Sequence, residues 1–297
     1  MRVFVTGASG WVGSVVTQEL LRHGHSVLGL ARSDASAAAV TAAGADVLRG
    51  DVRDTDSLIA GAQSADGVIH TAFIHDFSKF VENCEIDRRA VTAMAGVLAD
   101  TGKPFVVTSG TGVVSSADRT SEDVRVADVR HSFPRIASEQ AAEAAAARGV
   151  NVSVVRLSPS VHGAGDHGFV PRLIQLARET GKAAYVGAGD NVWPGVHRLD
   201  AARLYRLALE RNAQDARYHA AENRGTPFRA IAETIGRRLG LPVASLTPDA
   251  APAHFGWLSP FAMLDNPTSS DWTRATLGWA PTQPDLPGDL DSAAYFA

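Results

Sequence analysis

Short apolar stretches alternate with longer segments of helical periodicity along the first 220 residues. Apolar and β-branched residues predict buried strands at 2–6, 26–30, 45–48, 67–71, 103–108, 151–157 and 217–220. After the first of these, apolar side chains recur at helical spacing at Val12, Val15, Val16 and Leu20. This alternation indicates right-handed βαβ units, and therefore an α/β fold with a doubly wound parallel sheet.

The pattern changes after residue 222. A helix is predicted from Thr226-Pro227 onward, and beyond it prolines at positions 242, 248, 252, 260 and 267 are interspersed with aromatic residues. The acidic and basic run SEDVRVADVR, at 121–130, is expected to form a solvated loop.

The first predicted strand and helix are joined by a glycine turn with the spacing Gly7-x-x-Gly10-x-x-Gly13. Glycines let the backbone pass close to a pyrophosphate, and the first turn of a helix offers unpaired N–H groups at the positive end of its dipole. The turn therefore predicts a dinucleotide site, with a purely structural glycine turn as the alternative.

With Thr6, the stretch TGASGWVG resembles the TGxxGxxG signature of the short-chain dehydrogenase/reductase superfamily, in its extended, epimerase/dehydratase-like form. The resemblance extends over nearly the whole chain. It implies a Rossmann-type doubly wound parallel sheet with a smaller C-terminal substrate-binding lobe. We expect the NADP-binding domain at 1–158 and 196–221, and the lobe at 159–195 and 222–297.

The resemblance also implies which residues bind the cofactor. Asp51 and the amide of Val52 would contact the adenine, although Asp51 could instead only shape a turn before a helix capped by Asp54 or Thr55. Glu139 would accept hydrogen bonds from ribose hydroxyls. The other positions implied are the glycine turn, the end of the fourth strand and the segment after the sixth: Gly7, Ser9, Gly10, Trp11, Val12, Gly13, Thr71, Ala72, Phe73, Pro159, Ser160 and Val161.

The end of the second strand favours NADP over NAD. An acidic residue there would bind the ribose 2′-hydroxyl of NAD, but this chain has Arg32 and Ser33, whose donors suit a 2′-phosphate. The alternative is that Arg32 is simply a solvated residue at the start of a loop. Asp34, one residue beyond Ser33, is expected to cap the alanine-rich helix that follows.

The catalytic signature of the superfamily is altered. In the pattern that resembles Y-x-x-S-K, the tyrosine position is Arg135 and the lysine position is Glu139, while Gly110 replaces the usual hydroxyl residue. Ser109, Thr111 and Arg135 are the catalytic candidates. Arginine polarises a carbonyl or binds a carboxylate but cannot act as a general acid near neutral pH. Alternatively, Arg135 and Glu139 form an exposed i,i+4 ion pair. Further candidates are His75, His162, His167 and Tyr185.

Composition and charge limit the kinds of partner that the protein is expected to bind. The formal net charge is −4, so no basic surface for nucleic acid or an anionic membrane is expected. Cys84 is the single cysteine, which excludes an internal disulfide, and no metal-ligand cluster is evident. No apolar run approaches the length of a membrane span, and we expect a cytoplasmic protein. Homodimers are common in the superfamily.

The sequence thus predicts an NADP(H)-dependent oxidoreductase that acts on a small carbonyl or hydroxyl compound with non-standard acid/base residues. Loss of the tyrosine and the lysine leaves a second hypothesis, a non-catalytic NADP(H)-binding regulatory or redox-sensing protein. Epimerase or dehydratase chemistry is disfavoured, because such enzymes resemble the NAD-binding pattern and depend on the missing tyrosine.

Overall fold

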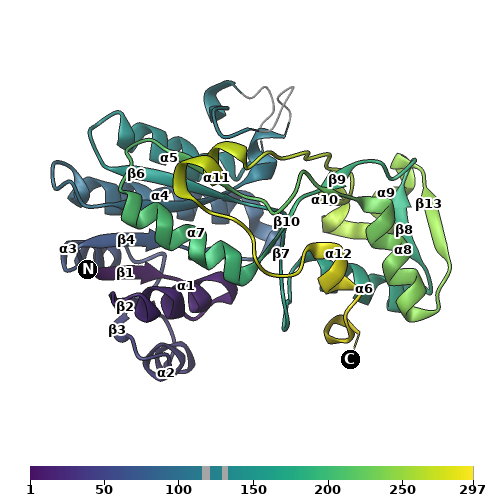
Figure 1. Ribbon diagram of the computed structural model, residues 1–297, viewed down its shortest axis with the longest axis horizontal. Coiled ribbons are helices and arrows are strands. Elements are labelled where there is room, and N and C mark those ends of the chain that lie inside the picture. The colour runs from purple at the N-terminus through teal and green to yellow at the C-terminus, as the bar shows by residue number, and fades with distance from the viewer. Residues whose placement is uncertain (116–120, 129–132, 297) are drawn as a thin grey trace.

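A seven-stranded parallel sheet organises the protein, for which the computed structural model describes residues 1–115, 121–128 and 133–296 (Figure 1). The strand order is β11-β6-β5-β4-β1-β2-β3. The strands are β1 (Arg2–Thr6), β2 (Ser26–Ala31), β3 (Asp46–Arg49), β4 (Gly67–His70), β5 (Phe105–Gly110), β6 (Val152–Leu157) and β11 (Arg217–Ala220). The predicted doubly wound parallel sheet is confirmed.

Central strands are built from residues that fit a sheet covered on both faces. Val3, Phe4 and Val5 of β1 are fully buried, and Val5 pairs with Gly29 of β2 on one side and Ile69 of β4 on the other. The chain order reverses between β1 and β4, and such a switch point opens a crevice at the carboxyl ends of the strands.

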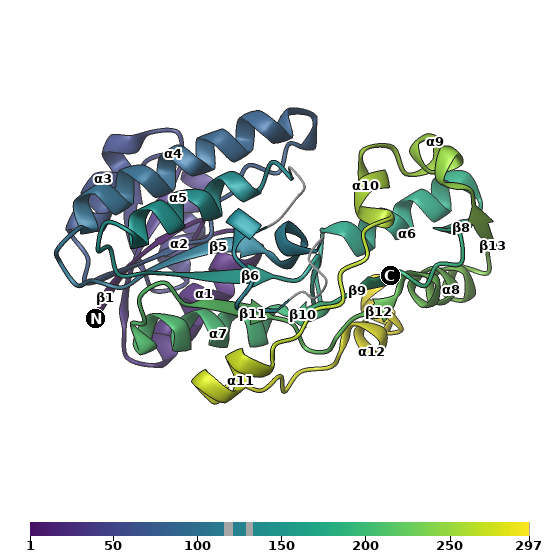
Figure 2. The ribbon, with the colours of Figure 1, turned by 90° about the horizontal axis from the view of Figure 1, so that it is seen from above.

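Helices cover the two faces of this sheet (Figure 2). One face carries α1 (Trp11–Arg22), α2 (Asp34–Ala42) and α7 (Arg198–Arg211), and the other carries α3 (Thr55–Gln63), α4 (Phe80–Leu98) and α5 (Ile136–Ala146). Each set buries apolar side chains against the sheet. The carboxyl ends of the strands point toward the second part of the molecule, and we call this end of the sheet its open edge.

This second part has an apolar core of its own, in which α6 (Phe169–Thr180) and α8 (Phe228–Leu239) pack together. Its helix α8 begins two residues later than expected, because Thr226 and Pro227 form β12, which pairs with β9. Whether the chain divides at the expected boundaries stays a prediction. The remaining elements are β7 (Ser160–His162), β8 (Ala183–Val186), β9 (Val192–Trp193), β10 (Gly195–His197), β12 (Thr226–Pro227), β13 (Val243–Leu246), α9 (Ala251–Phe255), α10 (Ser259–Ala262), α11 (Asp271–Leu277) and α12 (Leu286–Leu290).

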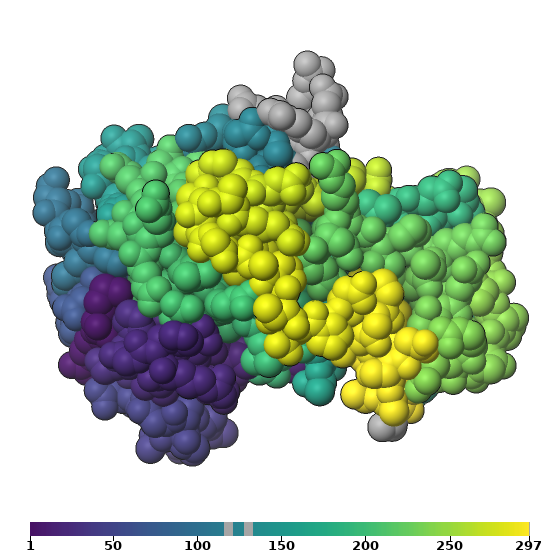
Figure 3. Space-filling view, viewed as in Figure 1, coloured from purple at the N-terminus to yellow at the C-terminus, as the bar shows by residue number. Residues whose placement is uncertain are grey.

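The C-terminal segment crosses from one part to the other (Figure 3). Its first helix, α11, lies against α7 and β11, and Trp279 is buried in the core of the sheet. Its second helix, α12, packs against α8, β7 and β10. One continuous segment, residues 271–290, therefore contacts both parts of the molecule, and we call it the C-terminal strap.

The described part of the chain contains no helix long and apolar enough to cross a membrane. It also contains no group of three or more His, Cys, Asp or Glu residues placed to hold a metal ion.

Candidate functional site

The glycine turn between β1 and α1 has a geometry that only small residues permit. Gly7 adopts φ +70°, and its carbonyl accepts the Gly10 amide at 2.8 Å. A Cβ on Gly13 would lie 2.0 Å from the Gly7 oxygen, and one on Gly7 would lie 2.8 Å from the Ala72 nitrogen. Helix α1 begins at Trp11 with no side-chain cap and no acidic residue in its first turn. This helix end therefore offers its N–H groups and positive dipole to an anion.

At the ends of β2 and β3, two guanidinium groups flank one carboxylate. Arg32 Nε lies 3.7 Å from Asp51 Oδ2, and Arg53 Nη1 lies 3.7 Å from Asp51 Oδ1. The Arg32 side chain is 71% exposed, so its charge is free to meet a ligand. Asp54 caps α3, as one alternative predicted, by accepting the amides of Asp56 and Ser57.

Ser33, rather than Asp34, caps α2. The Ser33 hydroxyl accepts a hydrogen bond from the Ser36 amide, and the Ser36 hydroxyl accepts one from the Ser33 amide. The predicted Asp34 cap is therefore wrong, because Asp34 lies in the first turn and pairs with Arg49. In this capping bond the Ser33 hydroxyl is the acceptor, and its own proton is donated to Ser36 Oγ at 3.2 Å, a bond that it would have to exchange to donate to a phosphate.

Trp11 joins the start of α1 to the segment after β6. Its indole N–H donates to the Val161 carbonyl at 2.7 Å, and the Arg198 guanidinium lies 3.8 Å from its ring centroid. Arg198 also donates to Ser14 Oγ at 3.0 Å, while its Nε is buried without a hydrogen-bond partner among the described residues. A cation at the positive end of a helix is unfavourable alone, so this placement suits an anion between them.

Arg135 and Glu139 do not pair with each other, contrary to the exposed ion pair considered above. Arg135 donates to Asp87 Oδ2 at 2.5 Å and to the Thr108 carbonyl at 2.9 Å, and its guanidinium lies 4.4 Å above the Phe73 ring. The interior of the protein therefore holds the guanidinium at the carboxyl ends of β4 and β5.

Behind Arg135, a buried chain of hydrogen bonds leads to the glycine turn. Thr6 Oγ1 accepts the Ala72 amide and lies 2.7 Å from His70 Nδ1, and His70 Nε2 lies 2.9 Å from Asp87 Oδ1. Burial raises the pKa of Asp87. The charge of Arg135 and the interaction of Asp87 with His70 outweigh burial and hold the pKa of Asp87 well below its usual range. Asp87 is therefore a carboxylate that fixes Arg135.

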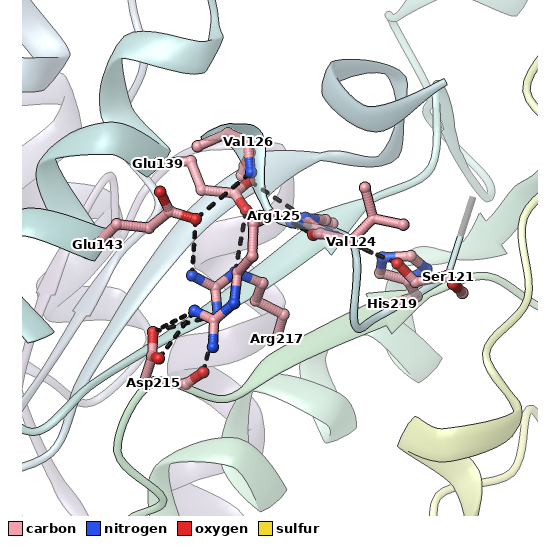
Figure 4. A network of polar contacts seen from close by, with 11 residues as sticks. Ser121, Val124, Arg125, Val126, Glu139, Glu143, Asp215, Arg217 and His219 are labelled. Carbon is pink, nitrogen blue, oxygen red and sulfur yellow. Dashed lines mark hydrogen bonds and ion pairs between the residues drawn. The ribbon is translucent and has the colours of Figure 1, made fainter. Parts of the chain in front are cut away.

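Glu139 is fully buried within a second polar network (Figure 4). Arg156 Nε donates to Glu139 Oε1 at 3.0 Å, Ser109 Oγ donates to Glu139 Oε2 at 2.7 Å, and Arg217 Nε lies 3.4 Å from Oε1. With both oxygens bonded inside the protein, Glu139 has no free acceptor to offer to a ribose. The carboxylate instead holds the Ser109 hydroxyl at the end of β5.

The run at 121–130 is not simply solvated where the structure describes it. Glu122 and Val126 are buried, and Glu122 accepts hydrogen bonds from both the amide and the hydroxyl of Thr273. Arg125 pairs with Asp215 at 2.8 Å (Figure 4). The alternation of charges suggested an exposed loop, but hydrogen bonds and ion pairs with distant residues bury part of this segment. Residues 129 and 130 lie outside the described residues.

The remaining catalytic candidates from the sequence lie partly near the carboxyl ends of the strands and partly in the lobe. Thr111 is buried and accepts a hydrogen bond from Asn266 at 2.7 Å. His162 is fixed by Glu222 and Asp289, one at each ring nitrogen. His75 and His167 contact Phe73 and Trp11 edge to face, whereas Tyr185 lies on β8 in the lobe.

Most predicted cofactor residues thus gather at the carboxyl ends of the strands. The glycine turn follows β1; Arg32 follows β2; Asp51 and Val52 follow β3; Thr71, Ala72 and Phe73 follow β4; and Pro159, Ser160 and Val161 follow β6. Sequence reasoning assigned no role to Asp87, His70 or Arg156, because their roles come from contacts between distant segments.

Comparison with known proteins agrees with this architecture. The model of the NAD dependent epimerase/dehydratase family matches residues 3–221. An uncharacterised protein of Schizosaccharomyces pombe is 47% identical over 100% of both chains, and one of Saccharomyces cerevisiae is 45% identical over 98% of each. A UDP-glucose 4-epimerase of Streptomyces lividans is 28% identical over 96% of this chain and 93% of its own.

Solved structures show the same fold. The dTDP-glucose 4,6-dehydratase DesIV of Streptomyces venezuelae, with NAD and TYD bound, superposes with a TM-score of 0.78 at 20% identity, covering 100% of this chain and 97% of its own. The sheet, the turn and these matches define an NAD-binding, oxidoreductase-like α/β protein. The chain belongs to the NAD dependent epimerase/dehydratase family.

Proposed function

We propose that the protein is an NADP(H)-dependent oxidoreductase that interconverts a small carbonyl compound and its alcohol, using non-standard acid/base residues. One observation carries this proposal: the glycine turn, the Arg135 guanidinium and the Ser109 hydroxyl all occupy the carboxyl edge of one sheet. This edge is where open α/β sheets bind their ligands.

The residues at this edge fit a dinucleotide. The close approach of Gly13 to Gly7 leaves the first turn of α1 uncovered, and Ser160 Oγ and Arg198 Nε are buried without a hydrogen-bond partner in the described part of the chain. Phosphate and ribose oxygens would satisfy such donors. Glu139 is left out of the proposed cofactor contacts because its oxygens are occupied by protein donors.

Arg32 supports NADP over NAD. Its exposed guanidinium follows β2, at the position where an acidic residue would bind the ribose 2′-hydroxyl of NAD. Asp51 is close enough to orient the guanidinium, but at 3.7 Å it leaves the donors of Arg32 available.

The chain's own groups suit carbonyl chemistry. A bound nicotinamide supplies or accepts the hydride at the reacting carbon. Arg135, fixed by Asp87 and Thr108, would polarise the carbonyl oxygen by its charge. Because an arginine keeps its proton near neutral pH, the proton gained by that oxygen must come from solvent, and the Ser109 hydroxyl would have to leave its hydrogen bond with Glu139 to relay it. Thr111, at the start of the turn after β5, would help to shape the site.

Fluorescence titration with NADPH and NADH, followed by incubation with aldehydes, ketones and sugar nucleotides, tests the proposal. We expect tighter binding of NADPH and its oxidation by a carbonyl compound. Failure of both dinucleotides to bind at millimolar concentration would refute a redox function.

A non-catalytic NADP(H)-binding regulator is the second candidate. It is favoured by the ties of Arg135 and Glu139 to buried partners, which give both residues a structural role. It predicts that NADPH binds without any turnover and changes oligomeric state or partner binding. Size-exclusion chromatography with NADPH and NADP⁺ separates the two candidates, and indifference of the elution volume to both would count against the regulator. The superfamily's frequent homodimers make a dimer the state to look for.

A further inference from the structure

Seven aromatic side chains meet between the open edge of the sheet and the lobe, and we call them the aromatic cluster. They come from the loop after β4, the short helix η1 (Phe77–Lys79), the start of α4, the residue before Pro134, the start of α6, the short helix η5 (Gly256–Leu258) and α10. Its members are Phe73, Phe77, Phe80, Phe133, Phe169, Trp257 and Phe261.

Unlike the aromatic residues of the cores, these residues all retain accessible surface. Trp193 and Phe228 of the lobe and Phe105 of the sheet are fully buried. Every residue of the cluster is at least partly accessible, and Trp257 is 43% exposed. Rings that served only to fill a core would be buried like the first group, so the cluster has surface left for a ligand.

The cluster begins at the proposed reacting groups. Phe73 follows Ala72, whose backbone contacts the glycine turn, and the Arg135 guanidinium lies 4.4 Å above the Phe73 ring. From Phe73 the ring contacts run through Phe80 at 6.2 Å and Phe77 to Trp257. A continuous aromatic path therefore joins Arg135 to the exposed side of the lobe.

Among the described residues, Arg135 is the one guanidinium that lies over a ring of the cluster, and Asp87 pairs with it. A nucleotide diphosphate requires cations for its phosphates, whereas aromatic faces bind flat apolar groups by stacking. Phe77 and Trp257 show this mode themselves, with centroids 4.3 Å apart and planes only 8° from parallel.

We propose that the aromatic cluster is the substrate site and that it selects a small carbonyl compound bearing a flat, aromatic group, rather than a nucleotide sugar. The flat group would stack on the exposed Trp257 ring, with the carbonyl end of the substrate extending along the ring path toward Arg135. This inference rests on the proposed function, because it takes the Arg135 edge as the reacting edge.

Calorimetric binding of three compounds tests this choice. Acetophenone and cyclohexyl methyl ketone have similar size and the same carbonyl, but only acetophenone is flat; UDP-glucose represents nucleotide sugars. We expect acetophenone to bind about five- to tenfold more tightly than its saturated analogue, given the strength of aromatic pairs, and UDP-glucose to bind most weakly. Equal affinity for the two ketones, or tightest binding of UDP-glucose, would overturn the proposal.

Substitution of Trp257 supplies the second arm. Trp257→Ala should weaken acetophenone binding about tenfold, and Trp257→Phe, which keeps a ring, less than about threefold. Trp272→Ala is the matched control, since that tryptophan is 46% exposed and stacks on Tyr218 instead. Unchanged acetophenone affinity in Trp257→Ala would refute the site.

The proposed function and this inference fail separately. Acetophenone binding is measured first without any dinucleotide, and NADPH affinity is measured on the same variants. Loss of acetophenone binding with unchanged NADPH affinity in Trp257→Ala supports the aromatic site, whereas absence of NADPH binding in the unmodified protein removes only the redox function.

Discussion

Arg135 and Glu139 stand one turn apart at the start of α5, yet they enter separate networks. Arg135 turns to Asp87 on α4, and Glu139 turns to Arg156 on β6. Burying a charge is costly unless it is paired and hydrogen-bonded, so each residue is fixed by the partner that its surroundings supply. Both residues thus combine a structural role with their place at the proposed reacting edge.

At the scale of one residue, we propose that Arg32 sets the preference between NADP and NAD. Arg32→Asp should weaken NADPH binding about tenfold to hundredfold, because hydrogen bonds to charged groups are worth about 1.5–3 kcal/mol, and should favour NADH. Fluorescence titration with both dinucleotides measures the change. Arg53→Asp is the control, since Arg53 lies at the same 3.7 Å from Asp51 but follows β3. Unchanged selectivity in Arg32→Asp would show that Arg32 does not bind the phosphate.

At the scale of elements, the contact between β1 and α1 depends on a missing side chain. Gly13→Ala would place a Cβ 2.0 Å from the Gly7 oxygen and force the turn apart. We expect a loss of about 1–3 kcal/mol in the free energy of unfolding, together with much weaker NADPH binding.

Gly96→Ala is the matched control for this substitution. Gly96 also lies inside a helix, but a Cβ there would meet nothing within 4 Å. Replacement of an unhindered helical glycine should raise stability by about 0.5–1 kcal/mol. Urea unfolding distinguishes the two variants, and an equally tolerated Gly13→Ala would contradict the close packing of the turn.

His162 links β7 to α12 through two carboxylates. Burial lowers the pKa of His162, but its bonds with Glu222 and Asp289 outweigh burial and raise it. The folded state therefore favours the charged imidazole. The stability gained is fully present below the unfolded pKa of about 6.5 and is lost as pH rises through the raised folded pKa.

Urea unfolding at pH 6 and at pH 9 measures this effect. His162→Gln should cost about 3–5 kcal/mol at pH 6, because it removes the charged partner shared by the Glu222 and Asp289 carboxylates, and should reduce the difference between the two pH values. His23→Gln, at a half-exposed histidine that faces Glu19, should change little. A pH dependence retained in full by His162→Gln would assign it to other groups.

For the whole molecule, the C-terminal strap is part of the main core. Trp279 is buried beside α7, and its indole N–H donates to the Asp200 carbonyl at 2.9 Å. Asp200 in turn accepts the amides of Thr282 and Gln283. Residues 271–290 therefore stabilise the sheet as well as the lobe.

Trp279→Ala should lower the free energy of unfolding by about 3–5 kcal/mol, because the cavity would open inside the core. Trp272→Ala, in the same strap but 46% exposed, should cost less than about 1 kcal/mol. Urea unfolding followed by circular dichroism provides both values. A loss in Trp279→Ala as small as that in Trp272→Ala would mean that the strap contributes little to the core.

The sequence by itself determined the parallel sheet and the glycine turn, because both depend on residues that are close together in the chain. The sheet follows from the periodicity of the strands, and the turn follows from glycines at fixed spacing between Thr6 and Ser14. Tertiary structure alone decided the partners of the charged groups. Asp87 lies 48 residues before Arg135, and Arg156 lies 17 residues after Glu139, so only folding brings each pair together. The i,i+4 spacing of Arg135 and Glu139 suggested a local ion pair, but helix α5 sits between two buried sites that offer each side chain a closer and better desolvated partner.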